Sequence, residues 1–371
     1  MRPHPTAHSQ SVPLPLILIL LMAACVAAPG TPPVIQPQEA PTEVPPTPRV
    51  TAVALPGWLA IHFTNSSAPG AADYQGGPDE QLAAAIDGAR LSIDMAAYSL
   101  NLWSIRDALL RAERRGVVIR MVMESDNMDE PEVQALIDAG IPVLGDQREG
   151  LMHDKFVVID RSEVWTGSMN YTVGGGYYDD NNLVRIRSVQ AAENYKAEFD
   201  EMFVEHLFGQ DVLAATPHPR LTIDGTPVEI YFSPDDGVAA RILELLQGAQ
   251  ESIYFMAFSF TSDELAQALL ERAGAGITVA GAMDDSQVAS NEGTEYDPFL
   301  QAGLDVRLDG EDGLMHHKVI IIDGRIVITG SYNFTASAEE YNDENVVIIF
   351  SEAAAVEFLR EFERVHQRMQ R

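Results

Sequence analysis

The chain has 371 residues, 46% of them hydrophobic, which is enough for one large domain or two medium-sized domains with their own apolar cores. Its formal net charge is −31, from 55 acidic residues against 24 lysines and arginines. A surface this acidic repels nucleic acids and anionic membranes, so a phosphate-bearing partner requires a locally basic site. The single cysteine, Cys25, excludes an internal disulfide.

The first 57 residues predict export and a tether. An apolar run from Leu14 to Ala24 is too short for a membrane span and ends in small residues directly before Cys25. Residues 1–25 therefore resemble a bacterial lipoprotein signal in which Cys25 is lipidated, and an ordinary secretory signal is the alternative. A proline-rich linker follows at 26–57 and predicts a semi-rigid tether. Both signals place the body of the protein outside the cytoplasm, on a membrane or secreted.

Strands and helices alternate through the rest of the chain. In the first half we expect strands at 59–64, 91–100, 117–125, 142–144, 156–160 and 164–167, and helices at 79–89, 104–115 and 131–139. The second half repeats this order, with strands at 228–232, 252–260 and 277–283, helices at 238–249 and 262–273, and a counterpart of the third helix at 297–302. Such alternation predicts layers of helix and sheet.

The two halves also share one motif, H-x-K-x4-D-x6-G-S-x-N. Its residues are His153, Lys155, Asp160, Gly167, Ser168 and Asn170 in the first half, and His316, Lys318, Asp323, Gly330, Ser331 and Asn333 in the second. Ser92 matches Ser252, 160 residues further on, whereas the motif histidines are 163 residues apart, so the halves differ by three residues in one loop. Six fixed positions repeated at identical spacing are a specific signal of an internal duplication.

This pair of motifs is similar to that of the phospholipase D superfamily, in which two such motifs build one phosphodiesterase site. The resemblance implies an α/β fold of two similar halves with α/β/α layers, related by a pseudo-two-fold axis, with the active site at their interface. We place the two domains at 58–208 and 226–371, so that a monomer is sufficient for a complete site. The resemblance implies no metal and no cofactor.

Cleavage of a phosphodiester needs a nucleophile, a proton for the leaving oxygen, and cations or hydrogen-bond donors around the phosphoryl oxygens. Two histidines can divide the first two tasks because imidazole titrates near neutral pH. The two lysines supply charge, and Ser168, Asn170, Ser331 and Asn333 are expected to donate to phosphate. Side chains alternate along a strand, so each motif histidine should point the same way as its lysine, and His317 should point away.

The resemblance assigns roles within the catalytic set His153, Lys155, Asp160, His316, Lys318 and Asp323. It implies that His153 attacks phosphorus and forms a phosphohistidine, and that His316 protonates the leaving group. The two aspartates are expected to be structural, each before a tight turn. Asp323-Gly324 is typical of a hairpin turn, whereas Arg161 lacks glycine's freedom, so we expect a different turn after Asp160.

One departure concerns the residue behind each histidine. The second half has Glu344 where the first half has Asn181. A carboxylate behind an imidazole favours its cation, whereas an amide only orients it. Because we expect Glu344 behind His316, His316 would be the better-supported histidine. The supporting residues therefore do not decide which histidine is the nucleophile.

Hydrolysis of phospholipid head groups is the leading hypothesis for function, with phospholipid as the partner. Transfer to an alcohol would use the same intermediate. A metal-independent endonuclease is the first alternative, and a nucleic-acid partner is disfavoured by the net charge. A non-catalytic phosphate-binding module is the second. Two further features stay open: the segment 174–178, GGGYY, either lines the site or is a simple loop, and Trp58 and Trp103 either touch lipid or belong to the core.

Overall fold

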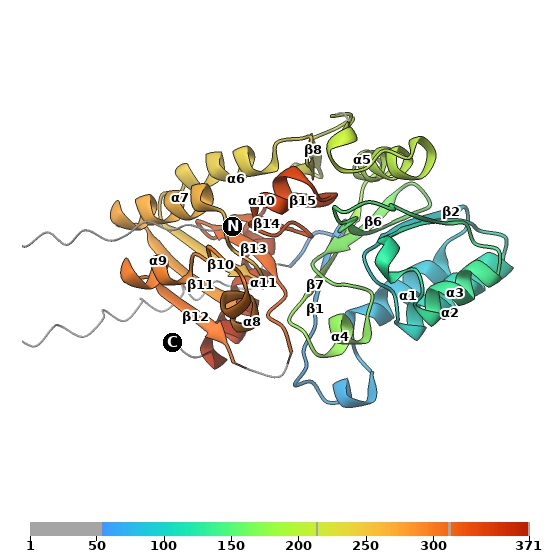
Figure 1. Ribbon diagram of the computed structural model, residues 1–371, viewed down its shortest axis with the longest axis horizontal. Coiled ribbons are helices and arrows are strands. Elements are labelled where there is room, and N and C mark those ends of the chain that lie inside the picture. The colour runs from blue at the N-terminus through green and yellow to red at the C-terminus, as the bar shows by residue number, and fades with distance from the viewer. Residues whose placement is uncertain (1–53, 213, 311–312, 370–371) are drawn as a thin grey trace, which may run out of the picture. The chain divides into compact units, whose positions relative to one another are not determined.

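A computed structural model describes residues 54–212, 214–310 and 313–369 (Figure 1). The predicted signal at 1–25, Cys25 and nearly all of the linker lie outside these residues, and the export and lipidation of the chain stay predictions. Within the described residues, no helix combines the length and apolar character that a membrane span requires.

The first half is built on a seven-stranded sheet in the order β1-β7-β6-β5-β2-β3-β4. Its strands are β1 (Leu59–Phe63), β2 (Ser92–Ala97), β3 (Val118–Met123), β4 (Val143–Gly145), β5 (Lys155–Ile159), β6 (Glu163–Gly167) and β7 (Asn182–Arg187). Its helices are α1 (Pro78–Gly88), α2 (Trp103–Arg114), α3 (Pro131–Asp138), α4 (Val173–Tyr177) and α5 (Val189–Asp200), with 3-10 turns η1 (Ala71–Asp73), η2 (Ser125–Asn127) and η4 (Gly209–Asp211) and the π-helical turn η3 (Glu201–Glu205).

The second half has an eight-stranded sheet in the order β12-β11-β10-β13-β14-β15-β9-β8. The strands are β8 (Arg220–Ile223), β9 (Thr226–Ser233), β10 (Ser252–Ala257), β11 (Thr278–Asp284), β12 (Asp305–Asp309), β13 (Lys318–Ile322), β14 (Ile326–Gly330) and β15 (Glu344–Phe350). The helices are α6 (Val238–Gln247), α7 (Asp263–Gly274), α8 (Asp285–Ser290), α9 (Tyr296–Gln301), α10 (Ala336–Glu340) and α11 (Glu352–Arg368).

The two sheets have the same topology. Reading the second from β9 to β12 reproduces the order of the first from β1 to β4, and β8 is added at the edge. In each half the central strand pairs parallel with the next strand in sequence and antiparallel with the motif strand, as β2 does with β3 and β5, and β10 with β11 and β13. The predicted duplication of an α/β unit is therefore confirmed.

Each sheet is covered by helices on both faces. On β5, Val157 and Ile159 join the core beneath α1, α2 and α3, whereas Phe156 and Val158 join a different core. That inner core is shared by both sheets and contains Tyr195 of α5 and Phe358 of α11. Because both faces are buried, the motif strands are continuous apolar runs. The resulting α/β/α layering agrees with the expected fold, although α5 and α11, which fill the space between the sheets, were not predicted.

The two motif hairpins use the same turn, which corrects one expectation. Asp160 and Arg161 have φ of 50° and 56°, and Asp323 and Gly324 have φ of 51° and 60°. Positive φ at both central positions is the geometry that joins two twisted strands most closely. Arg161 therefore adopts a left-handed conformation because the hairpin requires it, even though a side chain makes this conformation less favourable by about 1 kcal/mol or more.

Each motif strand begins at its lysine and is followed by its aspartate, Asp160 or Asp323. At this far end of the strand, each aspartate bonds to backbone amides of a neighbouring segment. The Asp160 carboxylate accepts hydrogen bonds from the amides of Arg90, Leu91 and Ser92, at 2.7–3.1 Å. Asp323 does the same with the amides of residues 250–252. Each aspartate thus fixes the entry of the central strand, and its place opposite the lysines matches the structural role expected of it.

Candidate active site

Each motif histidine is tied to the opposite half of the molecule by its backbone. The amide of His153 donates to the carbonyl of Asp343 (3.0 Å), and the amide of His316 donates to the carbonyl of Asp180 (3.0 Å). The histidines lie in the loops before β5 and β13, and the strands begin only at Lys155 and Lys318. The expectation that each histidine lies on the strand with its lysine is therefore wrong, because pairing across the halves replaces the strand ladder at this point.

The imidazoles are also supported from the opposite half. The Nδ1 atom of His153 lies 2.7 Å from Oε2 of Glu344, and that of His316 lies 2.9 Å from Oδ1 of Asn181. The expectation that Glu344 stands behind His316 is wrong. The carboxylate supports His153, the residue that the family resemblance makes the nucleophile, and the amide supports His316.

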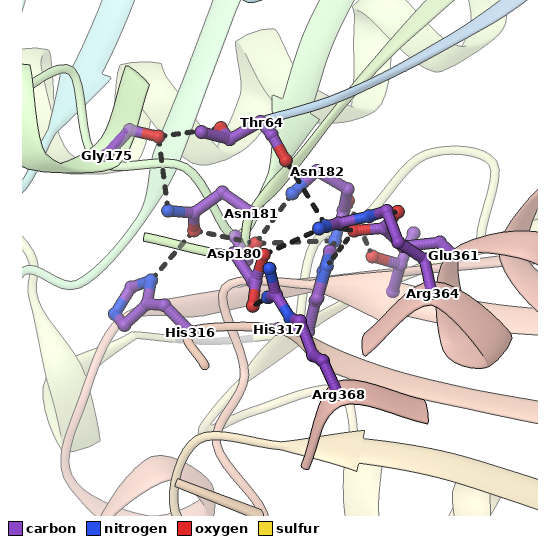
Figure 2. Close-up of polar contacts among 12 residues, drawn as sticks. Thr64, Gly175, Asp180, Asn181, Asn182, His316, His317, Glu361, Arg364 and Arg368 are labelled. Carbon is purple, nitrogen blue, oxygen red and sulfur yellow. Dashed lines mark hydrogen bonds and ion pairs between the residues drawn. The ribbon is translucent and has the colours of Figure 1, made fainter. Parts of the chain in front are cut away.

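Figure 2 shows how Asn181 is oriented. Its Nδ2 donates to the carbonyl of Gly175 (3.2 Å), which also accepts from the hydroxyl of Thr64 (2.8 Å). Its Oδ1 is therefore the atom that faces Nδ1 of His316, and it also accepts from the hydroxyl of Ser168 (2.9 Å). An amide oxygen can only accept, so Nδ1 of His316 carries a proton and the exchangeable position is Nε2.

Burial and neighbouring cations determine the charge states of the histidines. Burial, followed by the nearby Lys155 and Lys318, lowers the pKa of His153 and of His316 well below its ordinary value. Burial raises the pKa of Glu344 to about 7, opposed by Lys155. A neutral His153 that donates from Nδ1 to Glu344 keeps a free electron pair on Nε2, which is the form a nucleophile requires.

The two motif lysines, Lys155 and Lys318, are buried. The Nζ of Lys155 donates to the carbonyl of the histidine two residues before it (2.6 Å), and Lys318 does the same (2.9 Å). Their ammonium groups lie 5.1 Å and 4.6 Å from the ring centroids of Tyr98 and Phe258. Among the described residues, no carboxylate lies within ion-pair distance of either lysine. Burial lowers the pKa of Lys155 to about 8 and that of Lys318 well below its usual range.

The four residues expected to donate to phosphate are two asparagines and two serines, and the two kinds differ in burial and in hydrogen-bond partners. Asn170 and Asn333 are half-buried, and within the described chain the Oδ1 of each has no hydrogen-bond partner. Ser168 and Ser331 are fully buried and accept from the backbone amides of residues 182 and 345, respectively (both 3.0 Å). The serines therefore support the site from behind, and of the four residues only the asparagines keep an amide group, Nδ2, that can donate to a phosphate.

His317 points away from the site, as expected, although it precedes β13 and so does not follow strand alternation. Its ring bonds to the Asn182 amide (3.1 Å) on one side and to the Glu361 carboxylate (3.1 Å) on the other. Sequence analysis missed the adjacent ion pairs, in which Asp180 is held by Arg364 (2.8 Å) and Arg368 of α11 (Figure 2). It also missed Tyr98 and Phe258, although both occupy the same place in the repeat and could have been found from it. No group of three or more potential ligands is arranged around a metal position in the part of the chain that the structure describes.

Comparison with known proteins identifies the family. A model described as "Cardiolipin synthase, PLD-like domain" matches twice, at residues 82–203 and 242–366. The chain is 36% identical over 132 residues to a mitochondrial cardiolipin hydrolase of Xenopus tropicalis, covering 36% of this chain and 62% of that protein. It is 36% identical over 133 residues to a phospholipase D of Rickettsia typhi, covering 36% of this chain and 65% of that protein. The chain thus spans less than two thirds of the length of these relatives.

A solved structure has the same fold over most of the chain. The phosphatidylserine synthase of Haemophilus influenzae superposes with a TM-score of 0.61 at 14% identity, covering 84% of this chain and 87% of that one. Because the family model matches both halves, and each half supplies one histidine and one lysine to the site, the chain belongs to the phospholipase D-like family and carries two copies of its domain.

Proposed function

We propose that this protein is a phosphodiesterase of the phospholipase D type that hydrolyses the head-group phosphodiester of phospholipids through a covalent phosphohistidine. The observation that carries the proposal is the pair of buried lysines beside two buried histidines, where the carboxylates of the described residues, Glu344 among them, act on the lysines only from beyond ion-pair distance. Buried cations without an anion are unfavourable, so a site of this kind is stabilised by a bound anion such as a phosphate group. The two lysines are the cationic groups placed to meet a phosphate in a chain whose net charge is −31.

The geometry supports a division of roles between the histidines. Nε2 of His153 attacks phosphorus, so that a P–N bond forms and the P–O bond to the leaving alcohol breaks. The anionic phosphate of the bound substrate offsets the two lysines and favours the imidazolium form of His316, which gives its Nε2 proton to the departing oxygen. A water molecule then loses a proton to His316 and attacks phosphorus, and the P–N bond breaks. Lys155 and Lys318 stabilise the charge on the phosphoryl oxygens in both steps.

A lipid substrate fits the charge of the chain better than a nucleic acid does. A nuclease holds several successive phosphates and needs basic side chains beyond the reacting centre. The names of the relatives, cardiolipin hydrolase and phospholipase D, also refer to lipid substrates. We further propose that the protein acts outside the cytoplasm, tethered through Cys25, on the basis of the sequence alone.

The test is a parallel assay of the full chain in excess EDTA on phosphatidylcholine vesicles and on single-stranded DNA, with the His153→Ala protein as the blank. We expect release of choline and no cutting of DNA. Cutting of DNA alone would show that the local charge, and not the net charge, selects the substrate. Rapid denaturation in alkali, where a phosphohistidine is stable, should trap a phosphoryl group on the wild-type protein. Phosphate binding without any trapped intermediate or product would indicate a non-catalytic module.

A further inference from the structure

Four aromatic rings meet on the surface of the first half. Tyr74 lies at the centre, roughly perpendicular to Trp103, Tyr177 and Tyr178, with centroid distances of 5.6, 5.7 and 6.3 Å. Tyr177 is buried, but Tyr74, Trp103 and Tyr178 are 40%, 49% and 44% exposed. We call these four residues the aromatic cluster. They come from three segments: the residue directly after η1, the first residue of α2, and the last residue of α4 with the residue after it. Figure 1 labels α2 and α4.

Hydrogen bonds hold the aromatic cluster in place. Tyr177 packs beside the buried Asp79, whose carboxylate accepts from the Ser104 hydroxyl. Burial, followed by this carboxylate, raises the pKa of the Tyr177 hydroxyl. The hydroxyls of Tyr178 and Tyr74 lie 3.4 Å apart. A set of rings fixed on the surface in this way presents apolar area without the entropy loss of ordering loose side chains on binding.

The aromatic cluster adjoins the segment that supports the second histidine. Asp179 follows Tyr178 directly, and its Oδ1 accepts from the amide of Leu314 (3.2 Å). The next residue, Asp180, accepts from the amide of His316, and the one after that, Asn181, holds its ring. A surface bound to the cluster would therefore lie beside the interface of the two halves, where the site is.

The surroundings of the cluster are acidic. The segments 73–80, 101–107 and 173–179 contain four acids that reach solvent, Asp73, Glu80, Asp107 and Asp179, and one base, Arg106, whereas a fifth acid, Asp79, is buried. This arginine already pairs with Asp107 and Glu132. Such a surface repels phosphate backbones and anionic lipids and attracts cations. Tyrosine and tryptophan favour the head-group region of membranes, and their ring faces attract quaternary ammonium groups.

We propose that the aromatic cluster docks the protein on a phospholipid surface whose head groups carry quaternary ammonium, and so selects choline-bearing lipids for the site. The proposal rests on the phospholipid hydrolysis proposed above and specifies its substrate class. Trp103 and Tyr178 insert among the head groups, and the neighbouring acids hold the ammonium groups. The preference is thus for zwitterionic over anionic surfaces.

The test measures binding apart from turnover. The full chain with His153→Ala is mixed with vesicles of phosphatidylcholine or of phosphatidylglycerol, each containing brominated lipid that quenches tryptophan. Of the three tryptophans, Trp58 and Trp165 are buried and only Trp103 is exposed. The difference in fluorescence between this protein and one that also carries Trp103→Phe is therefore the signal of Trp103. This signal reports contact of the aromatic cluster with lipid even if another segment attaches the chain to the vesicle. We expect phosphatidylcholine vesicles to quench Trp103. Quenching by phosphatidylglycerol vesicles should be at least tenfold weaker.

Tyr341 provides a matched control. It is the counterpart of Tyr178 in the second half and is 49% exposed, but its ring contacts no other ring among the described residues. We expect Tyr178→Ser to weaken quenching by phosphatidylcholine about fivefold to tenfold and Tyr341→Ser to leave it unchanged. Equal quenching by both lipids, no quenching, displacement by a single-stranded oligonucleotide, or equal effects of the two tyrosine variants would each overturn the docking proposal. If the wild-type protein nevertheless cleaves short-chain, monomeric phosphatidylcholine, the phosphodiesterase proposal stands and only the docking proposal falls.

Discussion

Asn181→Asp would place a carboxylate beside Nδ1 of His316 with almost no change in side-chain size. Asn181 lies 2.9 Å from this nitrogen, and its orientation is fixed by Gly175. At this distance and an effective dielectric constant of about 20, Coulomb's law gives an attraction on the order of 5 kcal/mol, or about four pKa units. Burial of the new carboxylate opposes part of this attraction, so we expect the pKa of His316 to rise by about 1–3 units.

The sign of the effect follows from the role of His316 as the acid. Activity requires its imidazolium form, which is lost as the pH rises through its pKa. The groups that face it are Lys318, Lys155, His153 and His317, which all lower this pKa and remain in the variant. The alkaline limb of kcat/KM should therefore move to higher pH by about 1–3 units. A weaker acid transfers its proton less readily, so the plateau should fall several-fold.

The assay is the pH dependence of kcat/KM for a short-chain phosphatidylcholine, for the wild-type and Asn181→Asp proteins. The matched control is Glu344→Gln, which removes the carboxylate behind His153. We expect it to lower kcat/KM about 10–100-fold, because the nucleophile loses its anionic support, and to leave the alkaline limb in place. A profile that moves with Glu344→Gln and not with Asn181→Asp would refute this assignment of roles.

Three further predictions concern neighbouring residues. His153→Ala and His316→Ala should each abolish turnover, and near-normal turnover in either variant would contradict the two-histidine mechanism. His317→Ala should lower the urea midpoint of unfolding and leave kcat within about threefold of the wild-type value, because the ring of His317 bonds to residues away from the site. Burial raises the pKa of Asp154 to about 7, so it destabilises the fold increasingly as the pH rises from its unfolded value near 4 to about 7. Asp154→Asn should thus stabilise the protein at pH 8, by on the order of 3 kcal/mol, and hardly at pH 4, and an equal effect at both pH values would exclude this explanation. Asp180→Ala should cost about 1–3 kcal/mol in urea unfolding, since it removes a buried carboxylate that bonds to both Arg364 and Arg368 of α11, although Arg364 keeps its ion pair with Glu361. A loss below about 1 kcal/mol would mean that solvent and the remaining partners already satisfy the two arginines.

The sequence was sufficient to predict the fold because the duplication makes each half a check on the other. The alternation of apolar runs predicted β2, β3, β5 and the helices between them to within a few residues. It did not predict α5 and α11, whose buried aromatic faces have meaning only when two sheets are stacked against them. The turn at Asp160 was also misjudged, because the twist of the hairpin outweighs the local preference of Arg161.

The composition of the site was predicted, but its pairing was not. The motif placed two histidines and two lysines together, yet which half supports which imidazole depends on the register between the halves. That register is set by the single β-bridges of Met152 with Asp343 and of Asp180 with Met315, which pair residues far apart in sequence. No periodicity within one half contains this information.

In the proposed mechanism, the difference between the two copies of the domain is what gives the two histidines different roles. A symmetric pair of histidines would be equally good nucleophiles and equally good acids, although one turnover needs one of each. Glu344 stabilises positive charge on the ring of His153, and this charge develops as Nε2 bonds to phosphorus. Asn181 fixes the tautomer of His316 without stabilising its cation, so that the proton on Nε2 is more acidic and more readily given to the leaving oxygen. In the mechanism proposed here, replacement of one carboxylate by an amide thus gives each histidine the support that its own step requires, with His153 as the nucleophile.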